Sequence, residues 1–168
     1  MKKLALVSLV FFNTLFALGQ SNDMPNRKAA TKKLVIDAKN TYTQSVKAGP
    51  IITAGTTVNI YPGDTIYLEV TLVGTAIKGM KTVKKNLNPE ITLILTFDQH
   101  VENSTHKFMT LGIQNPFHKN LYYAASMLVM KSTTWTKVTV NPVLAEKGTY
   151  ETWPQIIVQM QLSGWQFK

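Results

Sequence analysis

The sequence contains no cysteine among its 168 residues. Without thiols, the chain cannot form disulfides, iron–sulfur clusters, thiolate zinc sites or blue-copper sites, and it has no cysteine nucleophile. It also lacks the cysteine that carries the lipid of a bacterial lipoprotein. An exported domain without disulfides depends on its hydrophobic core, which is more typical of bacterial proteins than of small eukaryotic extracellular modules.

Acidic residues and arginine are also scarce. The chain has 9 Asp and Glu against 18 Lys and Arg, a net charge of +9 at pH 7, and Arg27 is its only arginine. Specific recognition of nucleic acid relies on the bidentate contacts of arginine, so we expect no specific nucleic-acid partner. The positive charge still favours an anionic partner, such as an acidic polysaccharide or a surface of lipid headgroups.

Only one long apolar run is present, and it lies at the start of the chain. Lys2 and Lys3 precede the run from Leu4 to Leu18, and its end has small residues at Ala17 and Gly19, the spacing that a signal peptidase needs. This order predicts a signal peptide over residues 1–19, cleaved after Gly19. The run is shorter than a membrane span needs, and no second apolar segment of spanning length follows, so we expect no transmembrane segment. The predicted location is therefore secreted or periplasmic.

The rest of the chain shows no sustained helical period, and its main pattern is an alternation of apolar and polar residues. Ile66, Leu68 and Val70, for example, alternate with Tyr67 and Glu69. Alternation with a period of two is typical of strands that have one buried and one solvated face. The predicted strands are 33–38, 51–61, 65–73, 91–98, 106–114, 121–131, 134–140 and 155–162.

Turn residues separate these segments and suggest the fold class. Pro62, Gly63 and Asp64 predict a hairpin between 51–61 and 65–73, and the polar stretch 37–48 has room for a helical turn. Short strands with turn signals between them predict a single antiparallel β-sandwich of about eight strands, either immunoglobulin-like or jelly-roll. We expect this all-β domain to span residues 34–168, after a flexible lead-in over residues 20–33.

Four lysines are clustered between two predicted strands, at Lys78, Lys81, Lys84 and Lys85. The spacing suggests a flexible basic loop that contacts an anionic surface. The alternative is a solvated hairpin tip whose charges keep sheet edges apart.

Three aromatic residues are candidates for stacking on sugar rings. Tyr67 falls on the polar face of its strand, Trp135 begins a threonine-rich segment, and Trp153 follows Glu151. Aromatic rings beside hydroxyls and carboxylates suit glycan binding, because a flat ring packs on the CH face of a sugar. Packing in the core is the alternative interpretation of the same residues.

Histidine and methionine suggest a metal site. His106 and Met109, with His100 or His118 as a further ligand, would suit copper or zinc in an oxidising compartment. The spacing of Asp98, His100 and Glu102 also places three possible ligands on one face of an extended strand. These residues support the hypothesis of a periplasmic copper or zinc carrier. The alternative is ordinary surface histidines and a core methionine.

No motif of a nucleophilic enzyme and no phosphate-binding loop is present, and no cofactor is expected. A hydrolase that uses Glu151 or Asp98 as acid or base is an alternative. The leading hypothesis is an exported, non-catalytic binding or accessory protein of the bacterial envelope or extracellular space. Its expected ligand is another protein or a glycan.

Overall fold

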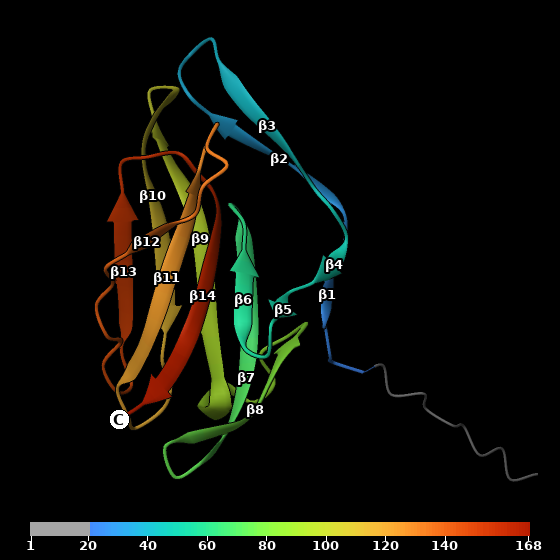
Figure 1. The fold of residues 1–168 in the computed structure, drawn as a ribbon, viewed down its shortest axis with the longest axis vertical. Coiled ribbons are helices and arrows are strands. Elements are labelled where there is room, and N and C mark those ends of the chain that lie inside the picture. Colours follow the sequence, from blue (N-terminus) through green and yellow to red (C-terminus); the bar gives the residue numbers. More distant parts are fainter. Residues whose placement is uncertain (1–20) are drawn as a thin grey trace, which may run out of the picture.

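The protein is an all-β sandwich of two five-stranded antiparallel sheets, as the alternation predicts (Figure 1). The computed structural model describes residues 21–168, so the predicted signal peptide lies outside the described residues. Residues 21–168 contain fourteen strands instead of the expected eight, because the predicted strand 51–61 is divided in two and strands also form at 26–27, 41–46, 49–50, 76–83 and 148–153. Within residues 21–168, no helix has the length and apolar character that crossing a membrane would require.

The first sheet has the strand order β13-β10-β9-β7-β8, and the second has the order β12-β11-β14-β6-β5. In the first sheet the strands are β7 (Asp64–Val73), β8 (Ala76–Val83), β9 (Thr92–Glu102), β10 (Thr105–Gln114) and β13 (Gly148–Trp153). In the second they are β5 (Ile52–Thr53), β6 (Thr57–Ile60), β11 (Leu121–Val129), β12 (Thr136–Val138) and β14 (Ile157–Phe167). A short 3-10 helix, η1 (Pro89–Ile91), precedes β9.

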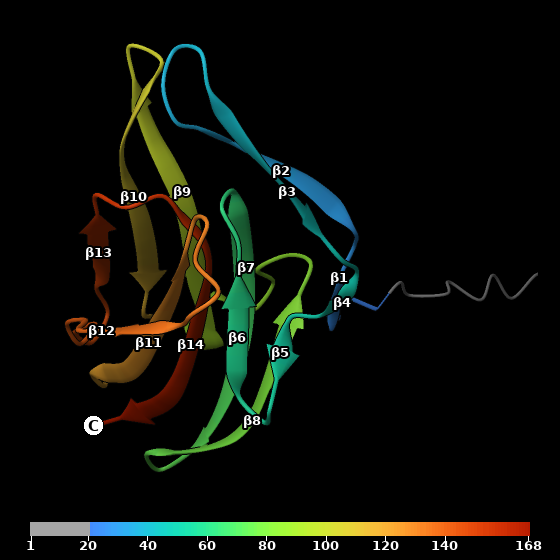
Figure 2. The ribbon, with the colours of Figure 1, turned by 45° about the horizontal axis from the view of Figure 1, so that its top comes forward.

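The inner faces of the two sheets pack together to form one hydrophobic core. Alternate residues of β9, such as Leu93, Leu95 and Phe97, are fully buried, and they face buried residues of β14 such as Met160 and Leu162. Because neighbouring residues of a strand point to opposite faces, this burial leaves the other face of each sheet to solvent. Figure 2 shows the two layers, with β11, β14 and β6 in one and β10, β9 and β7 in the other.

The predicted hairpin at Pro62, Gly63 and Asp64 is wrong. The strands on either side of this turn, β6 and β7, belong to different sheets, so the turn carries the chain across the sandwich. Gly63 has a φ of +76° and donates a backbone hydrogen bond to Phe97 O at 2.6 Å. A positive φ is easily adopted by glycine, so this residue allows the sharp change of direction. Alternation defines which side chains are buried, but not which strand is the partner.

Strand structure also occurs where a flexible lead-in was expected. Within residues 20–33, Asn26–Arg27 form β1, which pairs with β4 (Gly49–Pro50), and Ala30 begins β2 (Ala30–Val35). Strand β2 pairs with β3 (Thr41–Val46), which lies where a helical turn was expected. These segments have little apolar alternation, because they form a two-stranded arm outside the sandwich and bury few side chains.

The β2–β3 arm lies beside the end of the β9–β10 hairpin (Figures 1 and 2). The Gln99 side chain accepts a hydrogen bond from Val35 N at 2.9 Å and donates one to Val35 O at 2.7 Å. His106 N donates to Ile36 O at 3.2 Å. A few polar contacts therefore attach the arm to the first sheet.

Candidate ligand-binding surface

The four predicted surface lysines do not form a flexible loop. Lys78 and Lys81 lie within β8, an edge strand, and Lys84 and Lys85 follow it directly. Lys81 Nζ lies 2.9 Å from Asp23 Oδ1 and 3.4 Å from Glu69 Oε2, and the bond to Asp23 is the main cause that raises the pKa of Lys81. Two of the four lysines therefore bind residues 21–23, since Lys84 Nζ also donates to Ser21 O at 2.7 Å.

The structure gives the candidate metal ligands other roles. Both ring nitrogens of His106 are engaged, Nδ1 with Gln99 Nε2 at 3.0 Å and Nε2 with the Pro154 carbonyl at 3.0 Å. Met109 is fully buried in the core, and His100 stacks on Phe108 with ring centroids 4.5 Å apart. Among residues 21–168, no three His, Cys, Asp or Glu side chains form a group that would hold a metal ion. Nothing in this arrangement supports a metal carrier.

The two carboxylates proposed for hydrolysis lie on opposite faces of the first sheet. Asp98 pairs with Thr110 on the outer face, whereas Glu151 pairs with Leu111, a core residue. Glu151 Oε1 accepts hydrogen bonds from Asn141 N at 2.7 Å and Asn141 Nδ2 at 3.0 Å, so it closes a loop. The two groups are therefore not arranged as an acid–base pair.

The three aromatic candidates are not brought together. Tyr67 is half-buried on the outer face of β7, and Trp135 is exposed in the turn before β12 of the second sheet. Trp153 pairs with Met109 and packs against the core. Of the three, only Tyr67 lies on the open face of the first sheet.

The register of the strands brings a set of aromatic and hydroxyl side chains together on that open face. In the register of β9, β10 and β13, Thr96 pairs with Gly112, which pairs with Tyr150, and Asp98 pairs with Thr110, which pairs with Thr152. We call this surface the outer face of the first sheet. Its members include Thr65, Tyr67, Ile94, Thr96, Asp98, His100, Phe108, Thr110, Gly112, Gln114, Tyr150 and Thr152.

Tyr150 is the most prominent residue of this face, with 71% of its surface exposed. Gly112 allows the ring to lie close to the sheet, because an added Cβ would be 2.5 Å from Thr96 Oγ1 and 3.0 Å from Tyr150 Cε1. A hollow of about 50 Å³, lined by these three residues and Ile94, Ile113 and Gln114, lies beside the ring. The ring is thus supported from below and open to solvent above.

The stacked rings of His100 and Phe108 form a second flat element of this face, with an angle of 11° between their planes. Thr110 and the exposed carboxylate of Asp98 form the neighbouring pair, between these rings and Tyr150 in the register of the sheet. Flat rings, hydroxyls and one carboxylate on a single surface offer both apolar packing and hydrogen bonding to a polar, ring-shaped ligand.

Tyr150 could have been found from the sequence by extending the alternation to residues 148–153. In that pattern Tyr150 and Thr152 share one face, while Glu151 and Trp153 share the other. The aromatic and acidic pair was the more visible feature, but it lies on the inner face, where β13 closes over Met109 and Leu111.

Comparison of the chain with protein-family models, with curated protein sequences and with solved structures finds no match in any of the three. Its class is therefore defined by its own structure, an antiparallel β-sandwich with an open aromatic and threonine-rich face.

Proposed function

We propose that the protein is an exported, non-catalytic binding or accessory protein of the bacterial envelope or extracellular space, and that it binds a glycan on the outer face of the first sheet. The basic and apolar pattern of residues 1–19 supports export. The observation that carries the ligand assignment is the Tyr150 ring, exposed on its sheet and flanked by threonine hydroxyls.

The composition of this face favours a glycan over a protein ligand. A typical protein interface has an apolar core of fully buried anchors with charged residues depleted. The outer face instead has hydroxyls at Thr96, Thr110 and Thr152 and a carboxylate at Asp98, between its aromatic rings. This mixture matches a sugar, which has an apolar CH face and a rim of hydroxyl groups.

The test is binding of the purified protein to an array of bacterial, plant and host polysaccharides, with affinities measured by calorimetry for each glycan that binds. Tyr150→Ala should weaken binding about tenfold or more, since a lost stacking ring costs about 1.4 kcal/mol or more. Tyr150→Trp should retain binding, because the larger ring also stacks.

The matched control is Tyr122→Ala, which removes an exposed tyrosine from β11 of the second sheet. It should leave glycan affinity unchanged. Binding of no glycan, or equal losses in the Tyr150→Ala and Tyr122→Ala variants, would contradict the proposal. If the protein instead binds a protein partner, and only Tyr150→Ala abolishes this binding, the ligand of the outer face is a protein and not a glycan.

A further inference from the structure

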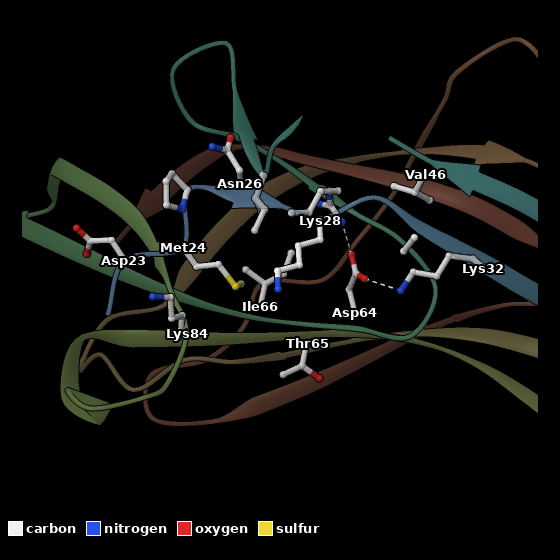
Figure 3. Close-up of a pocket in the computed structure, with 14 residues that line it drawn as sticks. Asp23, Met24, Asn26, Lys28, Lys32, Val46, Asp64, Thr65, Ile66 and Lys84 are labelled. Atoms are coloured by element: carbon white, nitrogen blue, oxygen red, sulfur yellow. Dashed lines mark hydrogen bonds and ion pairs between the residues drawn. The ribbon is translucent and has the colours of Figure 1, made fainter. Parts of the chain in front are cut away.

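A pocket lies at one margin of the outer face, where Thr65, which pairs with Thr96, contributes to its lining. It has a volume of about 580 Å³, within the range of small-molecule sites, and is drawn in Figure 3. Residues 23–28, the β2–β3 arm and the start of β7 enclose it. Its lining consists of Asp23, Met24, Pro25, Asn26, Arg27, Lys28, Ala30, Lys32, Val46, Ile51, Asp64, Thr65, Ile66 and Lys84.

One part of the pocket is apolar. Met24 packs against the core cluster, and Ile51 and Ile66 belong to that cluster. Val46, at the end of β3, is also buried. This wall continues the sandwich core to the surface between the arm and β7, so an apolar group placed there would be removed from water.

A second part of the pocket is a cluster of ion pairs around the Asp64 carboxylate, which already accepts three hydrogen bonds. Asp64 accepts bonds from Arg27 Nη1 at 2.6 Å, Lys32 Nζ at 2.7 Å and Tyr61 N at 3.1 Å. Figure 3 shows the Asp64 carboxylate pointing toward the Lys32 ammonium group. Arg27 also donates to Asn59 O and lies over the Tyr61 ring. The Asp64 carboxylate is therefore fully engaged, and the three groups together carry a net charge of +1.

Two further lysines are not neutralised by this cluster. Lys28 and Lys84 both line the pocket, and in the part of the chain that the structure describes neither forms an ion pair. Lys84 donates only to the Ser21 carbonyl, which is uncharged. The remaining acid of the lining, Asp23, is paired with Lys81. The pocket thus combines an apolar wall with two lysines that have no ion-pair partner among the described residues.

We propose that this pocket binds a small organic anion with an apolar body, of the class of medium-chain carboxylic acids. The apolar chain lies against Met24, Ile51 and Ile66, and the carboxylate lies within reach of the Lys28 and Lys84 ammonium groups. Hydrophobic transfer of the chain and charge-assisted hydrogen bonds to the lysines both stabilise the complex. A carboxylate group without an apolar chain contacts only the lysines, and an apolar chain without a carboxylate contacts only the apolar wall.

The test is calorimetric titration of the purified protein with decanoate, kept well below its micelle concentration. Acetate, which has the head group alone, and 1-octanol, which has an apolar body without charge, are titrated in parallel. We expect saturable binding of one decanoate, with acetate and 1-octanol at least tenfold weaker. The double variant Lys28→Gln and Lys84→Gln should lose at least tenfold in decanoate affinity.

The matched control is the double variant Lys78→Gln and Lys85→Gln, which removes the same charge from exposed lysines outside the pocket. It should retain decanoate affinity, and equal losses in the two double variants would overturn the proposal in favour of general electrostatic attraction. Ala30→Phe, which fills the pocket from β2, should abolish binding. Absence of saturable decanoate binding, or its persistence in a folded Ala30→Phe variant, would also overturn it.

Discussion

A single carboxylate, that of Asp64, connects three parts of the chain. It is bonded to Arg27 of β1, to Lys32 of β2 and to the backbone of Tyr61 after β6. The three charged side chains are largely buried, with exposed fractions of 12% for Arg27, 20% for Lys32 and 15% for Asp64. Hydrogen bonds between ionised groups at this depth are stronger than those of a surface pair. The position of the N-terminal strands therefore depends on this residue.

Asp64→Asn should lower the free energy of unfolding by about 2–3 kcal/mol, because it leaves Arg27 and Lys32 partly buried without a counter-charge. Urea denaturation followed by circular dichroism measures this loss. Asp98→Asn is the control, since Asp98 is exposed and should change stability by less than about 0.5 kcal/mol. Equal stability of the two variants would show that the Asp64 cluster contributes no more than surface charges do.

At the scale of elements, residues 21–24 protect the edge of the first sheet. Met24 N donates to Thr82 O at 2.8 Å and Lys84 N donates to Asn22 O at 2.7 Å, so this segment covers part of β8. The hydrogen bond and the positive charge of Lys81 lower the pKa of Asp23, which anchors the segment. A covered edge is less open to pairing with strands of other molecules.

Acidification should release this segment before the sandwich unfolds. Because the pKa of Asp23 is lowered in the folded protein, its contribution is complete above the ordinary aspartate pKa of about 3.9 and is lost as the pH falls through the lowered value. Native-state hydrogen exchange should show that the Met24 amide loses protection over this range, while core amides of β9 remain protected.

Asp23→Asn should reproduce this release at neutral pH. Asp37→Asn is a suitable control, because Asp37 also has a lowered pKa but lies in the turn of the β2–β3 arm, bonded to Asn40. Unchanged protection of Met24 in Asp23→Asn, or an equal change in Asp37→Asn, would contradict the assigned role of the Asp23–Lys81 pair.

A comparison of individual strands shows how much of the fold can be predicted from the sequence. Central strands with one fully buried face, such as 65–73 and 106–114, were predicted almost to the residue as β7 and β10. The two edge strands of the first sheet were not predicted, because β8 and β13 bury fewer side chains and have polar residues on both faces. The lysines of β8 therefore suggested a loop. Tyr150 was missed as a glycan-binding candidate for the same reason, because it lies on the edge strand β13.

At the scale of the whole molecule, the information missing from the sequence is the identity of each strand's partner. Strand β6 pairs with β14, so Ile60 is opposite Met160, a hundred residues further along the chain. The loop between β10 and β11 also crosses between the sheets, and the side-chain amide of Asn115 donates to the carbonyls of Lys119, Val143 and Leu144. Local alternation contains no record of such distant pairs.

This topology predicts slow folding. Long-range pairs such as β6 with β14 require the closure of large loops, and the entropic cost of closure comes before the contacts that offset it form. Refolding should therefore take milliseconds to seconds or longer. Stopped-flow refolding from urea measures the rate through tryptophan fluorescence, because Trp165 is buried between the sheets with its Nε1 bonded to Thr56 O. A short unfolding delay before refolding removes phases due to proline isomerisation. Recovery of the native signal within the first millisecond would contradict the assigned pairing of distant strands.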